Sequence, residues 1–381
     1  MPHLDRSVSR RTALRAGVGA TAAAGLGLLP QLAAPASASA NANASANAGG
    51  ADLSFVIDCA DWGARPPSSP VLMQVGTTRK IIVHHMEFPN VTDYSRAQAI
   101  RLAQQCQNLH MDHNGWIDTG QHFTVSRGGY VLEGRHRSLE ALTAGTEQVQ
   151  GAHCIGENSQ GIGIENEGTY FTETPPEVQF QSLTHLCIAI CRQYGLTANH
   201  IFGHWDYNDT DCPGRAFYRE FPTLRRNVAQ CLGQTDFPDR TWPDVYDGNA
   251  GPVVRVVQWL LMNQGYAVTT TDGFDAATVA AIQDLQGKLG VIVASDGTVT
   301  DPTWEALGVP LRQGDSGNAV QALQSILVNK GYTLTQSGDF DHDTHKAVQD
   351  MQRLHWLEPT GKVDTDTWCA TVGGIVADEF A

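Results

Sequence analysis

The stretch IIVHH at residues 81–85 predicts a buried β-strand that carries an imidazole to the edge of a sheet. Isoleucine and valine are β-branched and favour strands, and a short continuous apolar run is typical of a strand that is covered on both faces. Two histidines complete the run. The chemistry of these residues alone leaves open whether His84 or His85 points into a site.

A second stretch, GHWDYNDTDCPG at residues 203–214, has the composition of a loop that folds around an ion. Asn, Asp, Pro and Gly favour turns, which allows the backbone to bring His204 and Cys212 together. Two imidazoles and one thiolate suit Zn²⁺, and three protein ligands leave the fourth tetrahedral position for water. The two stretches together predict a zinc site of the catalytic type.

Short motifs occur in a fixed order along this part of the chain: WGAR at 62–65, IVHH at 82–85, GWIDTGQHF at 115–123, EGR at 133–135, GAH at 151–153, GIGIE at 161–165 and GHWDYNDTDCPG at 203–214. With these motifs the chain resembles the type 2 N-acetylmuramoyl-L-alanine amidases and the peptidoglycan recognition proteins that share their fold. The resemblance spans about residues 54–232. It implies that the first histidine of the pair is a ligand, so that Zn²⁺ is held by His84, His204 and Cys212.

The pattern of residues 54–232 predicts an α/β domain with a central mixed sheet flanked by helices. Helices are expected over 94–112, 176–195 and 215–231, and a hairpin is expected where residues 122–125 and 130–132 bracket an Arg-Gly-Gly turn. A short strand should end at Glu165. Ligands would then project from strand ends and loops at one edge of the sheet.

The resemblance also suggests a general base. Many amidases among the recognition proteins carry Tyr two residues before Phe, whereas this chain has Gln121 there, and an amide cannot accept a proton with the needed strength. Another branch of the family uses the glutamate of an Ile-Gly-Ile-Glu strand, which is Glu165 here. We therefore expect Glu165 to be the catalytic acid and base. His122 and Glu167 are the alternatives.

Further contacts are expected around the reacting amide. Thr210, two residues before Cys212, is placed to hydrogen-bond a developing oxyanion, although a loop-stabilising role fits the sequence equally well. The resemblance implies substrate contacts for His153 and Asn158, and for Gln121 at most a part in positioning substrate. For His153 a purely structural role stays open.

Beyond residue 232 the chain contains an internal repeat. A helical pattern recurs 66 residues later (residue 265 against residue 331), so that Val254, Val257, Gln258, Leu261 and Gly265 correspond to Val320, Leu323, Gln324, Leu327 and Gly331. Each copy predicts a small all-α domain of three helices and resembles the peptidoglycan-binding domain found beside wall hydrolases. Because the repeated apolar residues are mostly core, the pattern indicates fold more strongly than binding.

The N-terminus predicts export by the twin-arginine route. SRRTALR at residues 9–15 precedes an Ala/Gly-rich apolar stretch, and small residues near position 40 suit cleavage. Pro30 and Gln31 interrupt that stretch, which argues against a membrane anchor. The expected organisation is a signal peptide at 1–40, a flexible tether at 41–53, a zinc amidase domain at 54–232, a linker at 233–250, and repeats at 251–309 and 312–375.

The net charge argues against nucleic acid as a binding partner. The 381 residues carry 25 Lys and Arg against 40 Asp and Glu, a net charge of −15, which would repel a phosphate backbone.

Eight cysteines lie in the part expected to be exported, where disulfides persist. With Cys212 on zinc, seven remain, so at least one is free or pairs between molecules. Cys187 or Cys191 is placed to reach Cys231.

The sequence therefore predicts a secreted, monomeric zinc enzyme. The resemblance implies that its partner is peptidoglycan and that it hydrolyses the amide between N-acetylmuramic acid and the L-alanine of the stem peptide. A non-catalytic peptidoglycan receptor and a zinc peptidase acting within the stem peptide are the alternatives; the presence of Cys212 argues against the receptor. An amidase domain ending near residue 232 has its own core and is expected to fold and cleave soluble fragments by itself.

Overall fold

The computed structural model describes residues 51–76, 78–271, 273–291 and 297–380. The predicted signal peptide and most of the predicted tether lie outside these residues. No helix within the described residues is long and apolar enough to cross a membrane.

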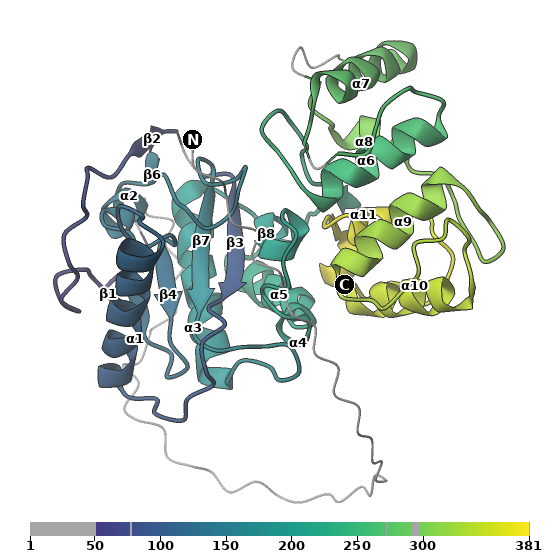
Figure 1. The fold of residues 1–381 in the computed structure, drawn as a ribbon. Coiled ribbons are helices and arrows are strands. Elements are labelled where there is room, and N and C mark those ends of the chain that lie inside the picture. The colour runs from purple at the N-terminus through teal and green to yellow at the C-terminus, as the bar shows by residue number, and fades with distance from the viewer. Residues whose placement is uncertain (1–50, 77, 272, 292–296, 381) are drawn as a thin grey trace, which may run out of the picture. The chain divides into compact units, whose positions relative to one another are not determined.

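A six-stranded mixed sheet forms the centre of the first part of the chain (Figure 1). Only the β4–β5 pair is antiparallel, and it forms the predicted hairpin; the other neighbours are parallel. In spatial order the strands are β1 (Val56–Ile57), β5 (Val131–Glu133), β4 (Phe123–Val125), β7 (Gly161–Asn166), β3 (Lys80–His85) and β8 (Ile201–Gly203). A second, two-stranded sheet pairs β2 (Met73–Val75) with β6 (Glu147–Val149).

The alternation of side chains along the strands gives the sheet two faces: a core face, which packs against helices, and the opposite face, here called the site face. On β3 and β7, Ile81, Val83, Ile162 and Ile164 belong to the hydrophobic core beneath α3 (Glu177–Tyr194) and α5 (Phe221–Leu232). Successive side chains of a strand point to opposite faces, so residues 82 and 84 of β3 and residues 163 and 165 of β7 face away from that core. The site face thus receives His84 and Glu165.

The helices of the first part agree with the expected positions, with two differences. Helix α1 (Arg96–Asn108) begins after Ser95, whose hydroxyl accepts from Gln98 N at 3.2 Å, and it continues as the π-helix η1 (Leu109–His113). The single helix expected over 215–231 is instead two, α4 (Arg215–Tyr218) and α5, because Pro222 in the first turn of α5 starts a new helix. Helix α2 (Ser138–Ala144) is short.

The C-terminal part consists of two three-helix repeats, as the sequence predicts. They are α6 (Pro252–Asn263), α7 (Ala276–Leu289) and α8 (Asp301–Leu307), then α9 (Asn318–Asn329), α10 (His342–Leu354) and α11 (Thr365–Thr371). One hydrophobic core cluster spans both repeats, and helices α6 and α9 pack against each other.

Most of the residues that recur in the two repeats are buried and stabilise the three-helix fold of each copy. Gln258 of the first repeat and Gln324 of the second are buried and donate to the threonine hydroxyls of Thr278 and Thr344, at 3.1 and 3.0 Å. The tryptophans Trp304 and Trp368, which close the two copies, are each 1% exposed. The repeated residues are therefore core, as expected.

The segment predicted as a linker is partly ordered. Its strand β9 (Arg240–Thr241) pairs with β10 (Ile375–Val376) from the end of the chain, and the 3-10 helix η4 (Ala377–Phe380) follows. The described residues all belong to one compact unit. The chain end therefore returns to the segment that precedes the repeats.

All eight cysteines are free, so neither Cys187 nor Cys191 forms the disulfide with Cys231 that the sequence left open. Cys187 and Cys191 are buried in the core beneath the sheet, whereas Cys231 is exposed on α5. Because the two buried thiols face the apolar core, they act as small hydrophobic side chains.

Candidate metal centre

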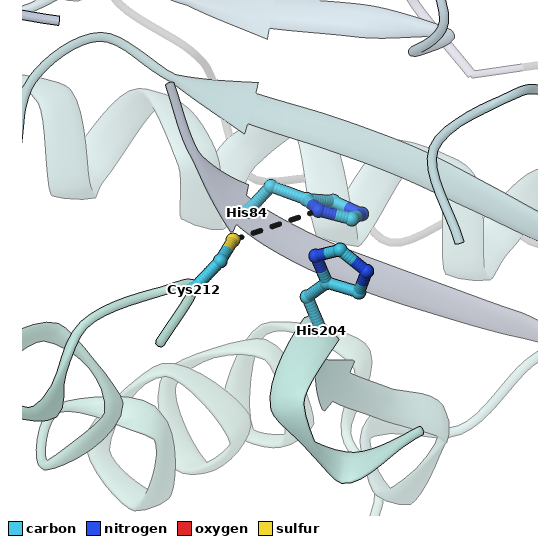
Figure 2. A group of neighbouring side chains, drawn as sticks. All are labelled: His84, His204 and Cys212. Atoms are coloured by element: carbon cyan, nitrogen blue, oxygen red, sulfur yellow. Dashed lines mark hydrogen bonds between the residues drawn. The ribbon is translucent and has the colours of Figure 1, made fainter. Parts of the chain in front are cut away.

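His84, His204 and Cys212 lie together on the site face of the sheet, and Figure 2 shows their side chains converging. One ligand atom from each lies within 4.8 Å of the others. The Cys212 Sγ is 3.6 Å from Nδ1 of His84. Strand β3 supplies His84, the 3-10 helix η3 (His204–Asp206) supplies His204, and the loop after it supplies Cys212 (Figure 2).

The hydrogen bonds of His153 select the nitrogen that His84 presents. His153 Nε2 is 3.2 Å from the carbonyl oxygen of Gly161, which can only accept, so His153 carries its proton there. Its Nδ1 then accepts from His84 Nε2 at 3.0 Å. This leaves the Nδ1 lone pair of His84 free and directed at the cluster, as a metal ligand requires.

A similar contact orients His204. Its Nε2 lies 3.1 Å from Oδ1 of Asn208, and an amide oxygen can only accept. The same oxygen accepts from the backbone of Ile155 at 2.9 Å, which holds the amide in place. His204 therefore presents an unprotonated Nδ1 to the centre.

The loop that carries Cys212 is fixed by its backbone. Trp205 N donates to Cys212 O at 2.9 Å, and Cys212 N donates to the hydroxyl oxygen of Thr210 at 3.2 Å. His85 contributes through its backbone, because its N–H donates to the Cys212 Sγ at 3.3 Å. Such a bond stabilises the thiolate form that binds metals.

Burial sets the protonation of the three groups. Desolvation, followed by the neighbouring His204, lowers the pKa of His84 well below its usual value, and desolvation lowers the pKa of His204 to about 4. Desolvation and then Glu165 raise the pKa of the Cys212 thiol well above its usual value. Two neutral imidazoles and a thiol whose ionisation needs a nearby cation form a donor set that fits Zn²⁺.

Glu165 lies beside this cluster. It is the register partner of His84 across β3 and β7, and its Oε1 lies 4.0 Å from His84 Nδ1. Its other oxygen, Oε2, has no hydrogen-bonding partner among the described residues, and burial raises the carboxyl pKa to about 8. A carboxyl with one free oxygen and a pKa near neutrality is suited to proton transfer.

Glycine at position 163 makes room for the histidine that supports His84. A Cβ built on Gly163 would lie 2.4 Å from the Cγ of His153, which is closer than real side chains approach. The Ile-Gly-Ile-Glu motif therefore has a structural basis. The glycine admits the His153 ring, and two residues later the glutamate emerges on the same face.

The alternatives to these residues have structural roles instead. His85 Nδ1 accepts from Tyr170 N at 3.2 Å. His122 bridges Gly163 N and Val149 O, and Glu167 accepts from Arg127 N at 2.7 Å. The geometry therefore favours His84 over His85 and Glu165 over His122 and Glu167.

A pocket of about 200 Å³ opens over the cluster. Gln121, His153 and Thr210 line it together with the three candidate ligands and Glu165. Gln121 is buried and its amide donates to Thr124 Oγ1 at 2.9 Å, which suits the minor role expected for it.

The structure does not bring Asn158, expected from the resemblance to contact substrate, into the pocket. Asn158 does not line the pocket, and its Oδ1 instead accepts from the backbone of His153 and Cys154, at 2.7 and 3.0 Å. Asn158 therefore shapes the loop that carries His153. His153 lines the pocket and also holds His84, so it has a structural contact besides the substrate contact that the resemblance implies.

Some residues at the site were not given a role from the sequence. Trp116 and Glu87 line the pocket, and Asn208 orients His204. Glu87 is exposed and has φ 56°, in the left-handed region that is uncommon for a residue with a side chain. Asn208 lies in the loop that the sequence singled out, yet only the folded loop shows which of its polar side chains contacts the imidazole.

Comparison with known proteins shows the family to which the chain belongs. The family model for N-acetylmuramoyl-L-alanine amidase matches residues 74–215, and the model for a peptidoglycan binding domain matches residues 250–307 and 316–370. A peptidoglycan recognition protein of Trichoplusia ni is 35% identical over 37% of this chain and 70% of its own length. The chain therefore belongs to the family of N-acetylmuramoyl-L-alanine amidases and peptidoglycan recognition proteins, and it carries peptidoglycan-binding repeats.

Other relatives match over smaller shares of their length. Peptidoglycan-recognition protein LB of Drosophila melanogaster is 30% identical over 42% of this chain and 65% of its own length. The human N-acetylmuramoyl-L-alanine amidase is 33% identical over 41% of this chain, and the match spans only 26% of that protein.

Proposed function

We propose that the protein is a zinc-dependent amidase that hydrolyses the bond between the lactyl group of N-acetylmuramic acid and the L-alanine of the stem peptide. The observation that carries the proposal is the convergence of His84, His204 and Cys212 beside Glu165 at the floor of one pocket. A receptor needs only the pocket. A third metal ligand and a side chain that can accept a proton serve hydrolysis, whereas binding alone needs neither.

Zinc held by the three ligands would polarise the amide carbonyl and make water more acidic. Glu165 then takes the proton of the attacking water and returns it to the departing amine of L-alanine. Its position fits both steps, because its nearer oxygen lies beside the ligand nitrogen of His84 while the other oxygen has no partner. Thr210 lines the same pocket, and in this proposal its hydroxyl donates to the oxyanion that develops on the carbonyl. The hydroxyl oxygen also accepts from Cys212 N, which is the loop-stabilising contact that the sequence left open.

The two C-terminal repeats would hold the enzyme on the insoluble wall and raise the local concentration of its substrate. The proposal includes export by the twin-arginine route, which the SRRTALR motif supports, action as a monomer, and no membrane anchor after signal cleavage. Such a protein would act on the cell wall from outside the cytoplasm.

Digestion of purified muropeptides, followed by mass spectrometry, tests the proposal. An amidase yields free glycan and an intact peptide that begins with L-alanine. A zinc peptidase shortens the stem peptide while leaving L-alanine on the sugar, and a receptor retains muropeptide without any change in its mass. The Glu165→Gln variant is the control, because it should keep zinc and lose the new products.

A further inference from the structure

The carboxylate of Asp206 organises the turn that carries His204. Asp206 ends the 3-10 helix that begins at His204, and it is fully buried. Its Oδ2 accepts from Gly203 N at 2.8 Å, and its Oδ1 accepts from the hydroxyl of Tyr218 at 2.9 Å. These bonds close the turn and so set the position from which His204 reaches the metal centre.

A third hydrogen bond to Asp206 comes from the second repeat. Lys330, which caps the C-terminus of α9, places its Nζ 2.7 Å from Asp206 Oδ1, and its side chain is 1% exposed. The ammonium also lies 5.3 Å from the ring centroid of Trp205 and 5.4 Å from that of Tyr218. A buried carboxylate is costly unless it is paired and hydrogen-bonded. Lys330 supplies the positive charge in this pair.

The three-helix fold of the repeats does not need a lysine at this position, because the first repeat folds without one. The residue equivalent to Lys330 is Gln264, at the same offset of 66 (residue 264 against residue 330), and it is exposed and donates to Ala306 O at 2.7 Å. By contrast, the buried glutamines Gln258 and Gln324 are identical in the two repeats and make the same bond. A lysine present in only one copy, and buried against a residue outside the repeats, indicates a role at that contact.

Two further contacts hold the second repeat and the end of the chain against the amidase domain, close to Asp206. Glu379, in the last 3-10 helix, pairs with Arg225 of α5 and also accepts from His355 of α10 at 2.7 Å; all three are fully buried. Arg225 in turn donates to the carbonyl of Ile201 on β8, the strand that leads to His204, at 2.9 Å. A Cβ built on Gly373, which follows α11, would lie 2.8 Å from Asp206 Cβ, so that turn is also packed against Asp206.

We propose that Lys330 is a positioning residue for the zinc ligand His204, acting through Asp206, and that the second repeat is therefore a structural part of the amidase. This inference rests on the proposed function, since it takes His204 as a ligand of a catalytic zinc. It also replaces the expectation that a domain ending near residue 232 works alone. Such a domain would leave the buried Asp206 without Lys330 and the buried Arg225 without Glu379, their partners of opposite charge.

The test uses the full chain with Lys330→Met, which keeps most of the side-chain volume and removes the charge. Zinc affinity is measured with Zn²⁺ and a competing chromophoric chelator, below the temperature at which the metal-free protein unfolds. We expect affinity to fall by about tenfold, the low end of the cost of losing a group bonded directly to a ligand, because Lys330 acts on His204 through Asp206. The kcat on soluble muropeptide should fall with it, and the visible spectrum of the Co²⁺-loaded protein should change.

Two further variants make the result specific. In Asp206→Asn/Lys330→Met no charge is left unpaired, so zinc affinity should recover most of the loss. Gln264→Met, the matched change in the first repeat, should leave zinc affinity and kcat as in the unchanged protein. If Lys330→Met does not fold, Lys330→Gln, which introduces the residue of the first repeat, takes its place with the same expectation.

The inference is overturned if Lys330→Met lowers only the unfolding temperature, while the zinc affinity, the kcat and the Co²⁺ spectrum stay unchanged. It is also overturned if the double variant loses as much zinc affinity as the single one. An unchanged full-length protein that binds no zinc and cleaves no muropeptide contradicts the proposed function instead, so the two failures are distinguishable.

Discussion

His84 and Glu165 are register partners on the adjacent parallel strands β3 and β7, with the Nδ1 of one 4.0 Å from the Oε1 of the other. One pair of register partners on adjacent strands thus supplies both a candidate metal ligand, His84, and a candidate proton carrier, Glu165. Side chains mounted on paired strands are held more precisely than side chains on loops. The hydrogen-bonded pairing of β3 with β7 therefore sets the distance between His84 and Glu165. The loop residues Cys212 and Thr210 complete the lining of the pocket.

Loss of any one ligand should abolish zinc binding and catalysis together. In His84→Ala, His204→Ala and Cys212→Ala only two protein ligands remain, and two ligands hold zinc poorly. Zinc content measured by atomic absorption after dialysis and muropeptide cleavage should both fall to background. His185→Ala, at an exposed histidine of α3, is the control and should change neither. A fully active Cys212→Ala variant would contradict the ligand assignment.

Replacement of the proton carrier should separate chemistry from metal binding. Glu165→Gln is expected to lower kcat by about 10²–10⁴-fold, the usual cost of a lost general base, while the protein retains one zinc per chain. Glu87 is the other carboxylate that lines the pocket, but it is exposed, so Glu87→Gln should lower kcat by less than about tenfold. The reverse ranking of the two variants would assign the role to Glu87.

The buried carboxyl of Glu165 should stabilise the metal-free protein at low pH, and this contribution should be lost as the pH rises. The pKa of Glu165 is raised from 4.5 to about 8 by burial, so the folded state prefers the protonated carboxyl. That contribution is fully present below pH 4.5 and is lost as the pH rises through about 8. Glu165→Gln cannot ionise, so in the presence of a chelator it should unfold at a higher temperature than the unchanged protein at pH 8, on the order of a few degrees.

The same measurement at pH 4 provides the control, because both proteins are then neutral at position 165 and should unfold at similar temperatures. Added zinc should reduce the difference at pH 8, since a nearby cation favours the carboxylate. A constant difference between pH 4 and pH 8 would mean that Glu165 does not titrate in this range.

Removal of the His153 ring, which accepts a hydrogen bond from His84, should weaken zinc binding without removing a metal ligand. His153→Ala leaves the Nε2 of His84 without its acceptor, so zinc affinity should fall by about 10–100-fold. Gly163→Ala should have a similar effect, because its Cβ would lie 2.4 Å from the His153 ring. The matched control is Gly287→Ala on α7, where a Cβ would meet nothing within 4 Å. Equal zinc affinity in all three variants, by chelator competition, would refute this role for His153.

Local patterns were sufficient to predict the main elements and the types of side chain at the candidate site. The β-branched run before His84 predicted β3, the Arg-Gly-Gly turn predicted the β4–β5 hairpin, and the offset of 66 between residues 265 and 331 predicted two copies of a three-helix fold. These features depend on residues that are close in sequence or repeat with a regular period, so a single chain reveals them. The split of residues 215–232 into two helices also had a local sign, in Pro222.

Only the tertiary structure decided how the polar groups pair. Residue chemistry left His84 and His85 equivalent, and the choice follows from the packing of Val83 into the core beneath α3, which turns its neighbour His84 to the site face. The pairing of His84 with His153 spans 69 residues and that of Asp206 with Lys330 spans 124. Such contacts leave no local pattern, because the sequence shows which donors and acceptors exist, whereas only the fold shows which of them are buried together.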